Sequence, residues 1–400
     1  MTRRLGPAWL TAERVALYGS LIPALYAAVL FFGILFPAEG LEERDFIAFH
    51  AAARLAWLGE AAAAYDDDRL QVMRNALVGD RPDGTSGYFG WFNPPHFLFA
   101  LLPLAPLSYA HAWAVWIIAS GGALALGLRA VLPGAAPLVA VLSLPVTLVS
   151  LGVGQNGVVI AALLAGTLGL MDRRPVVAGI CLGQLTIKPH IGILFPILLA
   201  LTGRWRCFAA ATVTALLAAA AALLAFGSEP WLAFFGQLGG GAGRYLLDGD
   251  PVMRKIQSVY AGVAYLTGKT SLAAVLHGAT ALAATVLVLR LWLHRPEAQA
   301  ETRAAALIAG TYLVTPYVWM YDMPAFGVAA LFLLRAMLRD GALPWERPLL
   351  ALAAILPAFA VNPQPFVGTA VWWTVLILAW RRDRAFRGGA FSQAVPVPSS

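Results

Sequence analysis

The chain has 400 residues, a length that in a soluble protein would suggest two or three domains. Apolar residues make up 60% of it and charged residues only 12%, against roughly 45–50% and about 25% in soluble domains. This excludes a water-soluble surface and predicts an all-α polytopic membrane protein. The net charge of +7 then indicates basic cytoplasmic loops, and no nucleic acid is expected as a partner.

The first expected element is an apolar run over residues 15–36, which follows Arg3, Arg4 and Arg14. It is longer than the roughly 7–15 apolar residues of a cleaved signal peptide and close to the roughly 20 that span a bilayer. We interpret it as a retained first transmembrane helix whose N-terminus is cytoplasmic.

Residues 38–92 form an acidic segment that we assign to a first outer loop, because it holds ten of the 21 acidic residues. Apolar side chains at helical spacing predict one helix from Asp45 to about Leu58, and a second is expected over Asp67–Val78. Both are expected to be amphipathic helices on the outer membrane surface. Asp45 has two interpretations, an N-cap at the start of its helix or a general base held at the membrane surface.

The remainder is expected to be one integral membrane domain with about ten to thirteen transmembrane helices and both termini in the cytoplasm. Its parts are a helical bundle over 93–226 and 271–380, a second outer loop over 227–270 and a cytoplasmic tail over 381–400. Arginine-bearing loops set this orientation, and it requires the proline-rich residues 93–107 to be re-entrant or interfacial. Several apolar runs are short, as expected of half-helices that line a cavity.

A few polar residues interrupt the apolar segments on the predicted outer side. Lys188 is the only charge between Arg174 and Arg204, and Asp322 is the only one between Arg303 and Arg335. Ionisable groups at membrane depth are costly, so they are candidates for a functional site. Lys188 could instead extend to the interface, Asp322 could cap a helix beginning at Met323, and Gln155 and Asn156 could simply bond between helices.

No metal site is predicted. The histidines lack metal-ligand spacing, and the Asp66-Asp67-Asp68 run is better explained as a solvated helix start than as a cation site. Motifs for nucleotide phosphates or for a serine nucleophile are absent as well.

Several motifs, taken in chain order, together resemble a known family. They are Arg44-Asp45-Phe46 with Ala52-Ala53-Arg54 and Ala64-Tyr65-Asp66, Asn93-Pro94-Pro95 leading to Leu102-Pro103-Leu104-Ala105, Gly154-Gln155-Asn156, Lys188-Pro189, and Thr315-Pro316-Tyr317 with Tyr321-Asp322. Over residues 15–338 the chain resembles glycosyltransferase family 87, of the GT-C superfamily of multispanning transferases. Asn93 departs from the family, which often has tyrosine before the two prolines.

The resemblance implies a GT-C-like bundle that transfers mannose or a similar hexose from a polyprenyl-phosphate donor on the outer face of a membrane, here a bacterial inner membrane. The family's catalytic aspartate falls on Asp45. The implied residues for the donor phosphate are Lys188, Arg44, Arg54 and His190. The substrate cavity is expected to include Tyr65, Asn93, His96, Gln155, Asn156, Tyr321 and Asp322.

The expected chemistry needs no cofactor, because a lipid phosphate is already a good leaving group. The acceptor hydroxyl of a glycan, glycolipid or protein needs a base, and the departing phosphate needs positive charge. One base without a covalent nucleophile favours an inverting displacement. The alternatives are a polytopic transporter or lipid flippase with Lys188 and Asp322 on its pathway, or an O-antigen-ligase-like enzyme that would use the loop 227–270 with Arg244, Arg254 and Lys255.

Overall fold

A computed structural model describes residues 44–78, 90–237, 255–293, 299–361 and 366–389, with residues 25 and 28 as isolated positions. These residues form helices and no strands, apart from one isolated bridge between Ile256 and Trp319, so the predicted all-α class is confirmed for them. Four parts of the predicted organisation lie largely or wholly outside the described residues: the first helix 15–36, residues 79–89 of the first outer loop, residues 238–254 of the second outer loop, and residues 390–400 of the tail.

The first outer loop contains the two helices that its sequence predicts. They are α2 (Phe46–Trp57) and α3 (Asp67–Val78), joined by a short helix η1 (Ala61–Tyr65). Gly59, which has a φ of +83°, follows the end of α2. Asp66 caps the start of α3, since its carboxylate accepts the backbone N–H groups of Asp68 and Arg69 at 3.0 Å each.

The prediction that α2 is an amphipathic surface helix is wrong. Ten of its twelve residues are buried. Aromatic rings cover it, because Phe49 contacts Trp91, Phe97 and Trp116 with ring centroids 5.3–6.0 Å apart. The helical periodicity found α2 correctly, but the side chains that surround it come from later segments. Helix α2, which directly follows Asp45, is thus part of the protein core.

The rest of the first half is a set of helices interrupted at prolines and glycines. In chain order they are η2 (Pro95–Phe97), α4 (Leu98–Leu101), η3 (Leu102–Leu104), α5 (Tyr109–Val131), α6 (Ala135–Leu142), α7 (Pro145–Val153), α8 (Gly157–Leu170), α9 (Pro175–Gln184), η4 (Leu185–Ile187), η5 (Pro189–Gly192), α10 (Phe195–Leu201) and α11 (Trp205–Phe226). Prolines stand in the first turn of η2, α7, α9, η5 and α10, where a missing N–H costs least.

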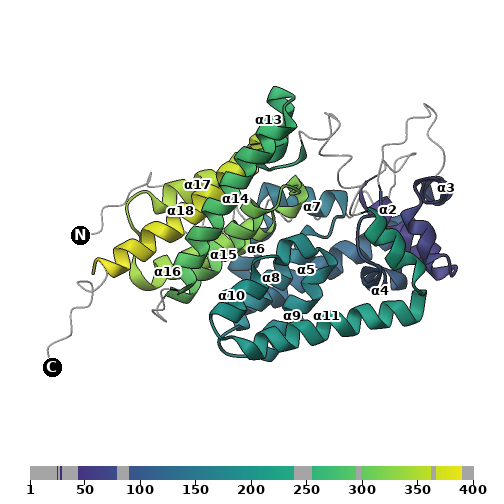
Figure 1. Cartoon of the computed structure of the whole chain (residues 1–400), viewed down its shortest axis with the longest axis horizontal. Coiled ribbons are helices and arrows are strands. Elements are labelled where there is room, and N and C mark those ends of the chain that lie inside the picture. The colour runs from purple at the N-terminus through teal and green to yellow at the C-terminus, as the bar shows by residue number, and fades with distance from the viewer. Residues whose placement is uncertain are drawn as a thin grey trace.

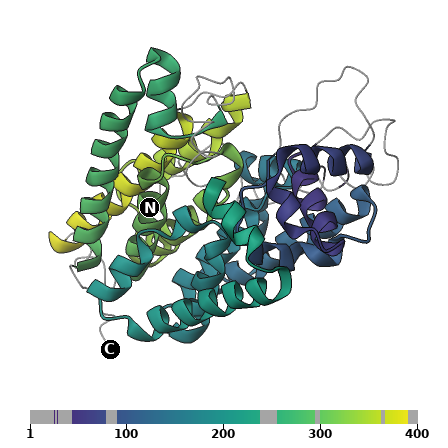
Figure 2. The same cartoon turned by 45° about the vertical axis from the view of Figure 1, so that its right-hand side comes forward.

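The second half begins with a helical stretch at 229–237, and its description resumes at residue 255. Its elements are α13 (Val259–Thr267), α14 (Thr270–Leu293), α15 (Ala300–Val314), η8 (Met320–Asp322), α16 (Ala325–Asp340), α17 (Glu346–Ile355), η9 (Leu356–Val361) and α18 (Val367–Arg387). Figures 1 and 2 show α13–α18 gathered at one side of the molecule and α2–α5, α9 and α11 at the other.

Among the described residues, three helices are long and apolar enough to cross a membrane: α5, α11 and α14. A fourth crossing is possible if α6 and α7, which meet at an angle of 73°, form one broken span. The apolar stretch from Ala135 to Val153 is therefore bent. The Pro-rich segment expected to be re-entrant is the short Pro95–Leu104, about 15 Å long if fully helical, half of a 30 Å hydrocarbon core. The total of ten to thirteen transmembrane helices stays a prediction.

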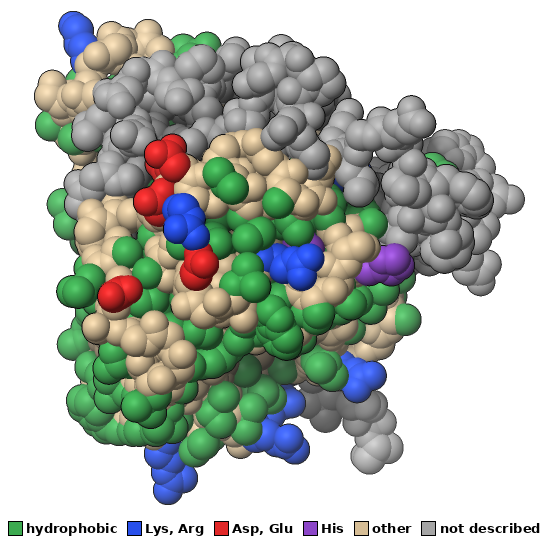
Figure 3. All heavy atoms as spheres, turned by 90° about the vertical axis from the view of Figure 1, so that its right-hand side faces the viewer, with side chains coloured by type: hydrophobic (Ala, Val, Ile, Leu, Met, Phe, Trp, Pro, Cys, Tyr) green, Lys and Arg blue, Asp and Glu red, His purple; other side chains and the backbone are tan. Residues whose placement is uncertain are grey.

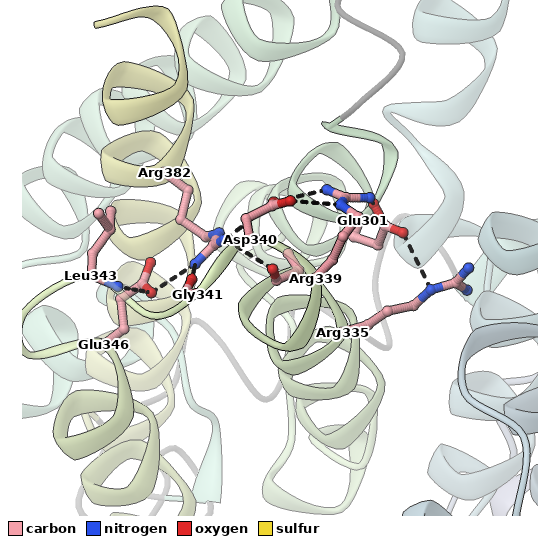
Figure 4. A network of polar contacts seen from close by, with 9 residues as sticks. Glu301, Arg335, Arg339, Asp340, Gly341, Leu343, Glu346 and Arg382 are labelled. Carbon is pink, nitrogen blue, oxygen red and sulfur yellow. Dashed lines mark hydrogen bonds and ion pairs between the residues drawn. The ribbon is translucent and has the colours of Figure 1, made fainter. Parts of the chain in front are cut away.

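A partly buried network of charges joins the ends of four helices in the second half (Figure 4). Its members are Glu301, Arg335, Arg339, Asp340, Glu346 and Arg382. Arg382 of α18 and Glu346 of α17 are almost fully buried, and their charges pair at 2.7 Å. Arg339 of α16 pairs with Glu301 of α15 at 2.8 Å. These contacts fix α15, α16, α17 and α18 to one another at one end.

One face of the molecule separates its charges into two zones (Figure 3). Acidic side chains, with a few Lys and Arg side chains among them, lie in the upper and middle parts of this face, a hydrophobic region lies below them, and the charged side chains along the lower edge are Lys and Arg. A hydrophobic band between zones of different charge is typical of a protein embedded in a bilayer.

Candidate active site

Asp45 precedes the first residue of α2, but its carboxylate does not cap that helix. The backbone there is already helical, with φ −52° and ψ −27°, whereas a capping residue is usually extended. One carboxylate oxygen instead accepts a hydrogen bond from Gln155 Nε2 at 3.3 Å. Of the two interpretations of Asp45, the N-cap interpretation is therefore not supported by the contacts of its side chain.

The environment of Asp45, which lies outside the membrane-spanning segments, makes its carboxyl a weaker acid than usual. Burial raises its pKa from 3.8 to about 6, because the charged form loses hydration. The Gln155 hydrogen bond and the positive charges of Lys255 and Lys188 lower the pKa again in part, while Asp322 raises it. A carboxyl with such a pKa is ionised at pH 7 and still basic enough to accept a proton.

Gln155 and Asn156 occupy a sharp break between α7 and α8. Gly154 makes this break possible with its left-handed φ of +72°, and its carbonyl accepts the Trp116 indole N–H at 2.9 Å. Gln155 then faces Asp45, while Asn156 is almost fully buried and begins a second set of contacts. The break thus places the Gln155 amide against Asp45 and the adjacent Asn156 amide against Lys188.

Lys188 lies at the break between η4 and η5 and forms a buried ion pair with Asp322. Its ammonium also donates to Asn156 Oδ1 at 3.3 Å and lies 5.3 Å from the centre of the Tyr321 ring. The alternative in which the Lys188 side chain extends to the membrane interface is therefore wrong. Its partner stands 134 positions later in the chain.

Asp322 uses its second carboxylate oxygen to hold the local backbone. This oxygen accepts the N–H of Trp319 at 3.0 Å, and the carbonyl of Asp322 accepts the Tyr312 hydroxyl at 2.8 Å. The alternative in which Asp322 caps a helix starting at Met323 is incorrect, since α16 begins at Ala325 and the carboxylate points to Lys188 and Trp319.

The network continues from Asn156 into the first outer loop. Asn156 Nδ2 donates to Asn93 Oδ1 at 3.1 Å, and the Tyr65 hydroxyl donates to the Asn93 carbonyl at 2.7 Å. Most of the predicted cavity residues therefore belong to one connected cluster, defined here as the central polar cluster. Its members are Asp45, Tyr65, Asn93, Gln155, Asn156, Lys188, Tyr321 and Asp322.

Four other candidates lie outside the central polar cluster. Arg44 donates to the Gly152 carbonyl at 2.8 Å and stacks over Trp113. Arg54 is in the last turn of α2, about 13 Å along the helix from Asp45. His96 contacts the Thr186 hydroxyl at 3.2 Å, and the ring of His190 packs against Tyr317. Arg44 and Arg54 are thus placed poorly for one common phosphate site.

Two features were not predicted for the glycosyltransferase site, although Lys255 was named for the O-antigen-ligase-like alternative. Gly157 lies so close to the Tyr321 carbonyl that a Cβ on it would be 1.8 Å from that oxygen. Lys255 reaches the surroundings of Asp45 from the second outer loop. A signal for Lys255 existed, because Lys188, Lys255 and Lys269 are the only three lysines in the sequence.

The Gly157 contact gives a direct test of this packing. Gly157→Ala is expected to lower the free energy of unfolding by about 1–3 kcal/mol, because the Tyr321 backbone must move away. Thermal melting in detergent measures the effect. Gly122→Ala in α5, where an added methyl meets open space, is the matched control and should be neutral or stabilising. A Gly157 variant as stable as the control would contradict the contact.

No group of three or more His, Cys, Asp or Glu side chains in the described part of the chain could hold a metal ion. The central polar cluster contains a carboxylate that can take a proton, together with Lys188 and several amides and tyrosines. Lys255 adds a second positive charge from outside the cluster. That a reaction here proceeds without a metal or cofactor stays a prediction.

A comparison with protein families matches the model of glycosyltransferase family 87 to residues 91–316, more than half of the chain. The match contains Asn93, the Gln155–Asn156 break and Lys188, whereas Asp45 and Asp322 lie outside it. No curated protein and no solved structure matches the chain. The matched family and the helical membrane fold together give the conclusion that this chain belongs to glycosyltransferase family 87 and is a membrane glycosyltransferase.

Proposed function

We propose that this protein transfers a hexose such as mannose from a polyprenyl-phosphate donor to an acceptor hydroxyl, with inversion at the sugar carbon and Asp45 as general base. The observation that carries the proposal is the environment of Asp45. Its carboxylate contacts an amide instead of capping its helix, has a pKa near neutrality, and lies within electrostatic reach of two lysines.

The proposed reaction is a single displacement. The acceptor oxygen attacks the anomeric carbon, its proton passes to Asp45, and the bond from that carbon to the phosphate oxygen breaks. The polyprenyl phosphate departs with the bonding electrons and gains negative charge. A base can contribute about 10²–10⁴-fold to such a step, and cations in a site of low dielectric constant stabilise the leaving group.

Lys188 has a defined part in this scheme. It neutralises Asp322 and orients Asn156, which in turn binds Asn93 beside Tyr65. These contacts favour Lys188 as the residue that holds Asp322, Asn156 and Asn93 in place next to the proposed donor site. Asn93 and Tyr321, which are partly exposed, present an amide and an aromatic ring that could contact the sugar.

The outer face of a bacterial inner membrane is the proposed location of the reaction, with both termini in the cytoplasm and a glycan, glycolipid or protein as acceptor. The acidic first outer loop and the Arg-bearing loops of the sequence support this orientation by the positive-inside rule. Among the described residues, the cationic lower edge of the face in Figure 3 is in keeping with it.

The donor class can be tested with purified full-length protein in liposomes. We expect sugar transfer from a polyprenyl-phosphate sugar and none from the corresponding nucleotide sugar. For the lipid donor, kcat/KM should fall about tenfold for each pH unit below about 6, because protonated Asp45 cannot accept the proton of the acceptor.

Melting curves recorded at each pH serve as the control, because they separate loss of the base from loss of the fold. A flat rate profile from about pH 5 to 8 would contradict Asp45 as the base. Use of the nucleotide sugar alone would contradict the donor class.

A further inference from the structure

Lys255 is the first described residue after residues 238–254 of the second outer loop, and hydrogen bonds hold the residues that follow it. Ile256, Gln257 and Ser258 are all buried, whereas Lys255 itself is exposed. Ile256 forms the isolated bridge to Trp319, and the N–H of Gln257 donates to the Val318 carbonyl at 2.6 Å. The backbone next to Lys255 is thus joined to the segment that contains Trp319 and Asp322.

Two further hydrogen bonds hold residues 257 and 258. The side-chain oxygen of Gln257 accepts the N–H of Gly368, at the start of α18, at 2.9 Å. Ser258 then caps α13 by accepting the N–H of Ala261 at 3.1 Å. Lys255 therefore projects from an anchored backbone, and its position relative to Asp322 is set by the fold.

The two lysines of the site differ in how their charges are used. Lys188 is buried and bonded to Asp322 and Asn156, so its charge is largely balanced within the protein. The ammonium of Lys255 forms no hydrogen bond or ion pair within the described part of the chain, and solvent reaches the residue. Its charge lowers the pKa of Asp45, and this effect is larger than that of Lys188.

We propose that Lys255 contacts the donor phosphate and stabilises it as it leaves, while Lys188 acts as a positioning residue through Asp322 and Asn156. This inference rests on the proposed function, because it assigns the phosphate of the same donor to a particular side chain. It also gives the second outer loop a role, since its anchored end delivers this cation to the site.

Charge balance supports this division of roles. The sugar-linked phosphodiester carries one negative charge, and cleavage of the bond from the sugar to its oxygen leaves a phosphate monoester with additional negative charge. The pair of Lys188 and Asp322 has no net charge, and Asp45 becomes neutral when it takes the acceptor proton. Lys255 is then the cation within the described site whose charge is available for the leaving group.

Because the chain has only three lysines, direct labelling can test the contact. Full-length protein in detergent is treated with an amine-reactive reagent, and the modified peptides are quantified by mass spectrometry. Undecaprenyl phosphate should protect Lys255 about tenfold or more, whereas undecaprenol, which lacks the phosphate, should not. Lys269, an exposed lysine at the start of α14, is the internal control and should label equally in all samples.

Kinetics provide the second arm of the test. Lys255→Met is expected to lower kcat/KM for the lipid donor by about 10²-fold, in the range found when one charge-stabilising donor is removed. Lys255→Arg should restore most of the activity, because the guanidinium also binds phosphate. Lys269→Met should behave as wild type.

Equal labelling of Lys255 with and without undecaprenyl phosphate would overturn the inference, as would wild-type kcat/KM in Lys255→Met. Either result with an active wild-type protein would leave the proposed function standing. A wild-type protein that makes no product from the polyprenyl-phosphate sugar would instead overturn the proposed function itself.

Discussion

Replacement of Asp45 by asparagine is expected to abolish sugar transfer and to make the protein more stable. Loss of the base should lower kcat by about 10²–10⁴-fold, while the side-chain oxygen of the asparagine can still accept the hydrogen bond from Gln155. Removal of a partly desolvated charge, whose pKa is about 6 in place of 3.8, should raise the free energy of unfolding by about 1–3 kcal/mol at pH 7.5. Transfer assays in liposomes and thermal melting in detergent measure the two effects.

The gain in stability should depend on pH in a defined direction. The carboxyl binds its proton more tightly in the folded state, so the wild type is favoured at low pH and loses this stabilisation as the pH rises from about 4 to about 6. The difference in melting temperature between variant and wild type should therefore shrink at pH 5.

Asp68→Asn, at an exposed position in the first turn of α3, is the matched control and should leave transfer unchanged. Full activity of the Asp45 variant would refute the mechanism, and a lower melting temperature at pH 7.5 would refute the described environment.

Single substitutions in the ion pair of Lys188 and Asp322 are expected to be strongly destabilising. Lys188→Met leaves a carboxylate that is about 1% exposed without its cation, and Asp322→Asn leaves a buried ammonium without its anion. Breaking such a pair from one side costs about 3–5 kcal/mol. The double variant Lys188→Met/Asp322→Asn buries no charge, so it should recover a large part of this loss.

A double-mutant cycle on melting in detergent measures the coupling between the two residues. The pair of Arg69 and Glu60, which is exposed on both sides, is the control and should show a coupling of at most about 1 kcal/mol. If the losses of stability caused by the two single substitutions simply added in the double variant, Lys188 and Asp322 would not form a buried ion pair.

Sequence reasoning found four members of the central polar cluster because such residues are rare in their surroundings, and the family resemblance supplied Tyr65, Asn93 and Tyr321. Lys188 and Asp322 are single charges within long apolar stretches, and Gln155 and Asn156 interrupt another. The cost of placing such groups at membrane depth made them candidates, and the fold brings them together. The resemblance to the family added Asp45, which composition and periodicity alone could not distinguish from a helix cap.

Contacts between distant segments could not be predicted in the same way. The pairing of Lys188 with Asp322 depends on how η4 and η8 pack against α8, and the burial of α2 depends on rings from 91–116. A periodicity locates a helix but does not show what covers its polar face. Lys255 illustrates the same limit, since its position follows from the backbone bridge between its neighbour Ile256 and Trp319.

The arrangement of charge in the second half of the chain also defines a thickness. Asp322, paired with Lys188, stands just before α16, and Asp340, in the network with Arg382, stands at its other end. The sixteen residues of α16 span about 24 Å, somewhat less than the roughly 30 Å hydrocarbon core of a typical bilayer. Because both charged ends of α16 are tied to neighbouring helices, we expect the protein to be most stable in a narrow range of membrane thickness. Lipids with longer chains would have to thin around it or cover one of the two layers.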